Sequence, residues 1–201
     1  DDLLEIEETN RERVRLLLDR YGILFRELLT HEADEFRWSS VFRSLRLMEL
    51  SGEVQSGYFF EDIPGPQFVS SAALTAITSS REDVFWLSAV DPISLCGCGL
   101  DLDLPRRVNS NYLVYQGGEV VLRIEQNGKK LFVANDVSAE QFSNYLGVFH
   151  HLLNRSWSPV KQIALETIND ESIRQSQYLE CFEAEFDVVR DHRSVYLQRK
   201  A

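Results

Sequence analysis

The stretch FRWSSVFRSLRLMELSGEVQSGYFFEDIPGPQF, residues 36–68, decides the expected fold of the amino-terminal part of this chain. Its first half predicts an amphipathic helix over about Arg37–Leu50, which Ser51-Gly52 then ends. One face of that helix is apolar at helical spacing and is expected to be buried; it carries Trp38, Val41, Phe42, Leu45 and Met48. The second half predicts two short strands, with Ser56-Gly57 as the turn between them.

Shorter helical segments flank this stretch. Val14, Leu17 and Leu18 repeat at helical spacing before Gly22, and ILFRELLTH (23–31) predicts a short second helix. SSAALTAITSS (70–80) predicts a last short helix and a linker. Three helices and a wing indicate a winged-helix domain over residues 11–80, a variant of the helix-turn-helix. Residues 1–10 are acidic and are expected to be frayed.

Polar side chains on the other face of the third helix are the candidate nucleic-acid contacts. They are Arg37, Ser39, Ser40, Arg43 and Arg46, to which we add Tyr58 near the tip of the wing. Winged helices use this face to approach phosphates or bases. The alternative is an ordinary amphipathic helix whose exposed face happens to be basic, because helix-turn-helix folds also serve in protein interaction.

The charge balance argues against a free-standing DNA-binding protein. The chain has 21 basic and 32 acidic residues, a formal net charge of -11. Only residues 36–58 are not net negative, because this stretch has three basic residues, Arg37, Arg43 and Arg46, and two acidic residues, Glu49 and Glu53. Repulsion between the acidic remainder and phosphates is expected to weaken any binding by this chain alone.

The second half, residues 81–201, predicts a mostly antiparallel α+β domain. A strand at 83–90 and a meander at 111–116, 119–125 and 130–134 are separated by turn dipeptides that hairpins favour. One long helix is predicted at 138–154, where Ser138 and Gln141 form a capping box. Further segments predict a strand, a helix and a closing hairpin at 160–168, 172–185 and 186–199. The expected fold class of the whole chain is therefore α+β.

Motif searches assign no catalytic and no metal-binding residue. The sequence has no phosphate loop, dinucleotide fingerprint, nucleophile elbow or H-E-x-x-H. The number of cysteines is odd (Cys96, Cys98 and Cys181), so a disulfide framework is not expected. This favours a reducing, cytoplasmic setting. They could hold a metal or be small buried hydrophobes, and Asp101 with Asp103 could be a weak cation site or solvated loop charges.

Two further observations limit the possible sites. His150 and His151 point about 100° apart on a helix, so they cannot share a metal and are expected to lie on the helix surface. No run approaches the roughly 18 apolar residues of a membrane span, so no membrane partner is expected. The chain begins with Asp1, which suggests a piece of a longer protein.

Several of these segments together resemble the carboxyl-terminal part of large helicase-related (Lhr-type) proteins of the superfamily 2 DEAD/DEAH helicases. The resemblance spans nearly all of residues 11–199. Its motifs here are Arg20-Tyr21-Gly22, Arg26, Trp38, Met48-Glu49, Gly52-Glu53-Val54, Gly57-Tyr58-Phe59, Gln67-Phe68 and Asp91-Pro92. Met48 stands where the family usually has leucine, and SLCGCGL departs from its usual small polar loop.

The resemblance implies a region that grips nucleic acid inside an ATP-dependent helicase. RecA-like motor domains of the same polypeptide would bind ATP and Mg, and this region would hold single-stranded or forked DNA, or RNA. Two other functions stay open: an interaction or structural module that braces the motor domains, and a glycosylase-like activity on damaged DNA, since the region also resembles winged-helix glycosylases. The nucleic-acid-gripping function predicts salt-sensitive DNA affinity, and the interaction module predicts no such affinity. The glycosylase-like activity predicts a product from damaged DNA without ATP.

Overall fold

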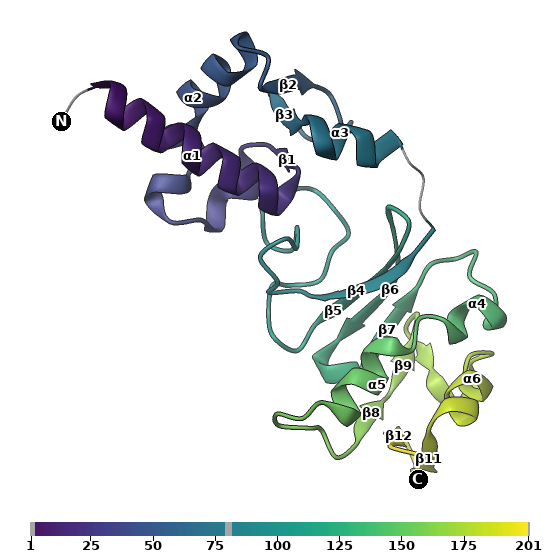
Figure 1. Cartoon of the computed structure of the whole chain (residues 1–201). Helices are drawn as coiled ribbons and strands as arrows, with labels where there is room; N and C mark the ends of the chain where they lie inside the picture. Colours follow the sequence, from purple (N-terminus) through teal and green to yellow (C-terminus); the bar gives the residue numbers. More distant parts are fainter. Residues whose placement is uncertain (1–2, 79–81, 201) are drawn as a thin grey trace. The chain divides into compact units, whose positions relative to one another are not determined.

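The computed structural model describes residues 3–78 and 82–200, which form two compact units (Figure 1). Unit 1 comprises Asp1–Ser80 together with the short segment Gly97–Leu102, and unit 2 comprises Arg81–Cys96 and Asp103–Ala201. The sequence did not predict that Gly97–Leu102 would group with the first unit.

Unit 1 is a winged helix. Its sheet has the strand order β1-β3-β2 and is antiparallel throughout, and α1 packs against α2 (Figure 1). The elements are α1 (Leu3–Tyr21), β1 (Ile23–Leu24), two 3-10 helices (Glu27–His31 and Asp34–Phe36), α2 (Trp38–Leu50), β2 (Val54–Gly57), β3 (Gln67–Ser70) and α3 (Ser71–Thr78).

The predicted apolar face of α2 forms the centre of this unit. Val41, Leu45 and Met48 are fully buried, as the spacing predicted. Trp38 and Phe42 are half-buried, and each ring centroid lies about 6 Å from that of Phe68, at 6.0 and 6.2 Å. The polar face of α2 is therefore held outward by the burial of the opposite face.

Three predictions for unit 1 were wrong in detail. The first helix begins at Leu3, so Leu3–Asn10 are not frayed; the ion pair between Glu7 and Arg11, one turn apart, supports this extension. Ile23 and Leu24 form a strand, because they pair with Val69 and Phe68 of β3 after the left-handed Gly22 has ended α1. The predicted turn at Ser56-Gly57 is part of β2.

The wing turn lies instead between β2 and β3, where a buried glutamine organises it. Gln67 is fully buried, and its Oε1 accepts hydrogen bonds from the backbone N–H groups of Phe59 and Phe60, both at 2.9 Å. Its Nε2 donates to the carbonyl oxygens of Phe60 at 2.8 Å and Ile63 at 3.0 Å. One side chain thus replaces the backbone partners that a tight hairpin would have supplied.

Unit 2 has two sheets and a layer of short helices. The larger sheet has the order β10-β9-β7-β6-β5-β4 and the smaller β11-β12-β8; every pairing is antiparallel except β7 with β9. The strands are β4 (Val84–Ser88), β5 (Tyr112–Gln116), β6 (Glu119–Glu125), β7 (Lys130–Val133), β8 (Ile163–Leu165), β9 (Thr167–Ile168), β10 (Glu171–Ser172), β11 (Asp187–Arg190) and β12 (Val195–Gln198).

The helices of unit 2 are shorter than the sequence predicted. They are α4 (Ala139–Ser143), α5 (Gly147–Asn154), α6 (Leu179–Glu185) and the 3-10 helices Gln126–Gly128 and Ile173–Gln175. The capping box of Ser138 and Gln141 is confirmed, but the single helix predicted at 138–154 was wrong. Backbone bonds tighten to the i+3 pattern at residues 144–146, and this turn directs both Tyr145 and Leu146 into the core.

One continuous core holds unit 2 together. Apolar side chains of β5, β6 and β7 meet those of α4, α5 and α6 and of the smaller sheet. Gly128 lies at this junction with a φ of 101°, and a Cβ at that position would approach Ile163 Cγ2 to 2.4 Å. The predicted strand at 160–168 is divided between the two sheets, because β8 pairs with β12 and β9 pairs with β7.

Candidate nucleic-acid interface

The polar face of α2 carries the predicted contact residues at the surface of unit 1. The Arg43 side chain is 85% exposed, and those of Arg37 and Arg46 are more than half exposed. Ser39 is exposed, whereas Ser40 is half-buried and its Oγ donates to the carbonyl oxygen of Asp34 at 2.7 Å. The Ser40 hydroxyl hydrogen is therefore already used inside the domain.

Each arginine of this face lies near a carboxylate. Arg37 Nη1 is 2.9 Å from Asp34 Oδ1, and Arg46 Nη1 contacts Glu49 Oε2. Arg43 is held least, because its Nε lies 4.0 Å from Glu7 Oε2. Exposed pairs of this kind contribute little to stability, but they cancel much of the positive potential that a phosphate would meet.

The wing adds an exposed aromatic side chain to the surface of unit 1. Tyr58 is 89% exposed and directly precedes the residues that Gln67 holds. Phe60 is only partly exposed, since its ring packs edge-on against the buried Phe25 with centroids 5.7 Å apart. Tyr58 is thus the aromatic ring of the wing that a base or sugar could contact.

An arginine that the sequence reasoning missed ties α1 to the base of the wing. Arg15 Nε donates to Glu53 Oε1 at 2.6 Å and its Nη2 to Glu53 Oε2 at 3.2 Å, a forked arrangement. Hydrogen bonding to Arg15 lowers the pKa of the Glu53 carboxyl. The pair joins residues 38 positions apart, so local pattern could not reveal it.

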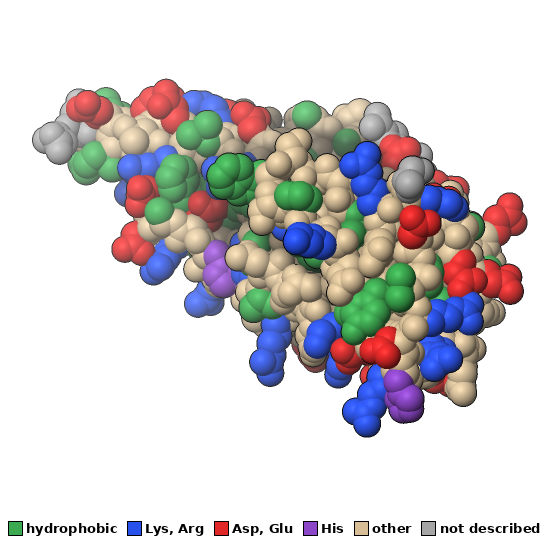
Figure 2. Space-filling model, turned by 90° about the horizontal axis from the view of Figure 1, so that it is seen from below, with side chains coloured by type: hydrophobic (Ala, Val, Ile, Leu, Met, Phe, Trp, Pro, Cys, Tyr) green, Lys and Arg blue, Asp and Glu red, His purple; other side chains and the backbone are tan. Residues whose placement is uncertain are grey.

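Basic and acidic side chains are mixed over the molecular surface. Figure 2 shows Lys and Arg interspersed with Asp and Glu on the face drawn. This mixture agrees with the net charge of -11 and with the ion pairs around α2.

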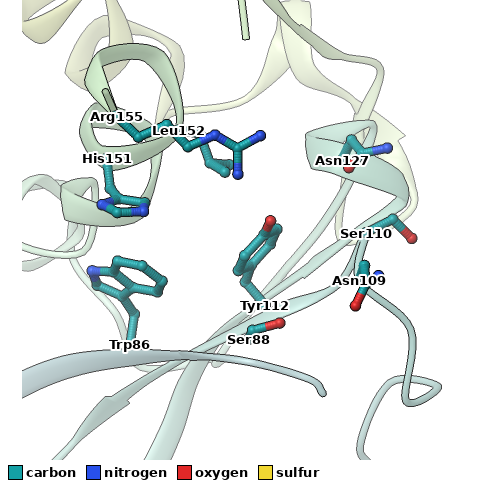
Figure 3. Close-up of a pocket in the computed structure, with 9 residues that line it drawn as sticks. All are labelled: Trp86, Ser88, Asn109, Ser110, Tyr112, Asn127, His151, Leu152 and Arg155. Atoms are coloured by element: carbon teal, nitrogen blue, oxygen red, sulfur yellow. The ribbon is translucent and has the colours of Figure 1, made fainter. Parts of the chain in front are cut away.

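A pocket of about 660 Å³ lies within unit 2 (Figure 3). Its aromatic lining comes from Trp86 of β4, Tyr112 of β5 and His151 of α5, and Arg155 extends into it just beyond the end of α5. The Trp86 and His151 rings are 4.8 Å apart and tilted by 47°. The sequence predicted His151 only as a helix-surface residue, and its place beside Trp86 depends on contacts between distant segments.

The three cysteines are buried and are not joined in disulfides, which corresponds to the small-hydrophobe alternative. Burial raises the pKa of the Cys96 thiol, and Cys96 packs with Ala89 and Leu113. Over residues 3–78 and 82–200, no three or more His, Cys, Asp or Glu side chains gather where they could hold a metal ion. The same ranges contain no helix that is long and apolar enough to cross a membrane.

Comparison with known proteins identifies the first unit. Residues 4–85 match the family model of the large helicase-related protein winged-helix domain. These residues form a winged-helix domain of the Lhr type. This result confirms the resemblance seen in the motifs between Arg20 and Phe68.

A relative from Escherichia coli (strain K12) extends the match beyond the winged helix. The protein named "Lhr helicase/uracil glycosylase" is 31% identical over 196 residues, which cover 87% of this chain. The chain spans only 12% of that relative's length. The similarity thus includes unit 2, and the chain corresponds to a small region of that relative.

Proposed function

We propose that this chain is an accessory region that grips nucleic acid in an Lhr-type helicase, through α2 and the wing of unit 1. The observation that carries this proposal is the exposure of Arg43 on the polar face of α2, where a 4.0 Å approach to Glu7 leaves most of the guanidinium open. Ser39 and Tyr58 are exposed on the same unit and would add contacts to sugar or base. Such contacts position a strand without reading its sequence.

The remaining partners follow from the similarity to Lhr-type proteins. RecA-like motor domains of the same polypeptide would supply ATP hydrolysis with Mg, since this sequence has no phosphate loop. Single-stranded or forked DNA, or RNA, would be the substrate, in the cytoplasm. Positively charged surface on those domains would complete a nucleic-acid-binding channel with unit 1. That surface would compensate for the net negative charge of this chain.

Fluorescence anisotropy with single-stranded and forked DNA tests this proposal at low and moderate salt. The chain should bind weakly, the affinity should fall as salt rises, and an Arg43→Ala/Arg46→Ala double variant should bind less. An Arg174→Ala/Arg199→Ala variant is the control, because it removes the same charge from unit 2 and leaves α2 unchanged. Equal loss in both variants, or no binding even at low salt, would contradict the proposal.

A second candidate is an interaction or structural module that braces the motor domains. The ion pairs that neutralise Arg37 and Arg46 favour it, as do Leu3 and Leu16, large apolar side chains of α1 that are more than half exposed. It predicts no salt-sensitive DNA affinity in the anisotropy measurement.

A third candidate is a glycosylase-like activity on damaged DNA, which the name of the E. coli relative favours. It would give base release from a lesion-containing oligonucleotide without ATP, and a chain that leaves such an oligonucleotide intact would exclude it for this region.

A further inference from the structure

The unit 2 pocket differs in charge from the rest of the chain. Its lining includes one arginine, Arg155, and no carboxylate, although acidic residues outnumber basic ones by 32 to 21 in the sequence. A cation without a nearby carboxylate attracts an anionic group more strongly than the neutralised arginines of α2 do. The pocket therefore favours a ligand with at least one negative charge.

Arg155 is already oriented for such a ligand. Its backbone N–H donates to the carbonyl oxygen of His151 at 2.8 Å, and its Nε donates to the carbonyl oxygen of Ser158 at 2.8 Å. The terminal nitrogens point into the pocket (Figure 3), and they make no hydrogen bond to any residue that the structure describes. A guanidinium fixed in this way presents a planar fork that suits a phosphate.

Aromatic rings form the part of the pocket beside this cation. Trp86 and Tyr112 meet edge to face with centroids 6.2 Å apart, and His151 lies against Trp86. Tyr112 is almost fully buried, so its ring position is set by the core, whereas Trp86 keeps part of its surface open. The open part of the Trp86 ring suits a stacked heterocycle, and Tyr112 borders it.

Uncharged polar groups complete the lining. Ser88, Asn109, Ser110 and Asn127 offer both donors and acceptors around the pocket (Figure 3). Asn127 adopts a left-handed φ of 58°, and its N–H donates to the carbonyl oxygen of Ser110 at 2.8 Å, which joins two sides of the pocket. A base edge with mixed donors and acceptors would find partners in amides and hydroxyls of this kind.

We propose that this pocket binds one nucleotide of a single-stranded nucleic acid, with its base stacked on Trp86 and bordered by Tyr112 and its phosphate at Arg155. The volume of about 660 Å³ is sufficient for one nucleotide. Trp157 is 88% exposed in the loop that follows Arg155 and offers a stacking face to a neighbouring base. This inference goes beyond the proposed function, because the α2 arginines take no part in it.

Titrations followed by NMR on the 201-residue chain test the proposal. The probes are thymidine 5′-monophosphate, thymidine, inorganic phosphate and a short oligothymidylate, and the signals are the Trp86 indole N–H and the His151 ring. The nucleotide should shift both signals and bind tighter than the nucleoside or phosphate, because only it engages the rings and Arg155 together. The oligothymidylate should bind tighter still and also shift Trp157.

Substitutions of Arg155 give the decisive comparison. Arg155→Leu should weaken nucleotide binding by roughly ten- to a hundredfold, the expected loss of a charge-assisted hydrogen bond, and leave thymidine binding nearly unchanged. Arg199→Leu is the matched control, since Arg199 is exposed in unit 2, makes no ion pair with a described residue and does not line the pocket. Arg155→Lys keeps the charge without the fork and should bind with intermediate affinity, which provides the same test if the leucine variant does not fold.

Three results would overturn the inference. They are shifts that map away from Trp86 and His151, equal affinity for phosphate and nucleotide, and an Arg155→Leu variant that binds like Arg199→Leu. The Arg43→Ala/Arg46→Ala variant should keep full nucleotide binding in the pocket. Failure of the pocket and failure of the α2 interface are therefore distinguishable.

Discussion

The α2 face and the unit 2 pocket both present arginine side chains, but the surroundings of those arginines differ. On α2, Arg37 and Arg46 already contact Asp34 and Glu49, whereas no carboxylate lines the pocket around Arg155. The comparison shows that neighbouring carboxylates can neutralise most of the positive charge on the arginine-bearing face of a helix in an acidic chain. The number of arginines on a face is thus a weaker guide to anion binding than the partners that each one has.

The two sites also share a feature, since a buried amide side chain organises the loop beside each one. Gln67 holds the wing through four hydrogen bonds. Near the pocket, Asn111 Nδ2 donates to the carbonyl oxygen of Arg106 at 3.0 Å, and its Oδ1 accepts from the N–H of Gln126 at 3.0 Å. Both loops are thus shaped by hydrogen bonds from an amide side chain to backbone groups.

The largest effect is expected from Gln67→Leu, which should destabilise unit 1, with its α2 face and wing, and leave the unit 2 pocket unchanged. The variant leaves the partly buried N–H groups of Phe59 and Phe60 without their partner, and it also removes the buried bond to the carbonyl oxygen of Ile63, at a cost of about 3 kcal/mol in the free energy of unfolding of unit 1. Urea unfolding with amide hydrogen exchange at Phe59 and Phe60 measures this cost. Gln55→Leu on the exposed side of β2 is the control, and an equal effect there would contradict the role given to Gln67.

A smaller effect is expected when the α2 arginines are released from their carboxylates. In an Asp34→Asn/Glu49→Gln variant, Arg37 and Arg46 keep their charge and lose their partners, so affinity for single-stranded DNA should rise about three- to tenfold at low salt. The slope of log K against log salt should steepen in anisotropy titrations. A Glu180→Gln/Asp187→Asn variant of unit 2 changes net charge equally, and the same gain there would show a general charge effect.

The smallest effect concerns pH and the Arg15–Glu53 pair. The pKa of Glu53 is lower in the folded protein, so the stability that this group contributes is present above its unfolded pKa of about 4.3 and is lost as pH falls through the folded pKa. Glu53→Gln should remove that part of the acid dependence in urea midpoints measured from pH 6 to 3. Glu61→Gln in the exposed wing turn is the control, and an identical pH profile for both variants would show that the pair contributes nothing.

Periodicity predicted the regular parts of the fold because their signals are local. The apolar spacing of α2 led directly to Val41, Leu45 and Met48 as core residues, and the capping box marked the start of α4. The family resemblance was also contained in short motifs. The start of the segment at 23–31 was misassigned, because Ile23 and Leu24 suit a helix or a strand and only pairing with β3 decides between them, whereas Glu27–His31 are helical, in a 3-10 helix.

The order of amino acids alone specified the helical faces, the meander and the family, since each depends on neighbours within a turn or a hairpin. Tertiary structure decided that Glu53 is the partner of Arg15, and that Trp86, Tyr112, His151 and Arg155 share one pocket. These side chains come from β4, β5, α5 and the loop after it, so only the completed packing of unit 2 brings them together. The physical reason is range: periodic patterns act over a few residues, whereas partners and pockets are set by segments tens of residues apart.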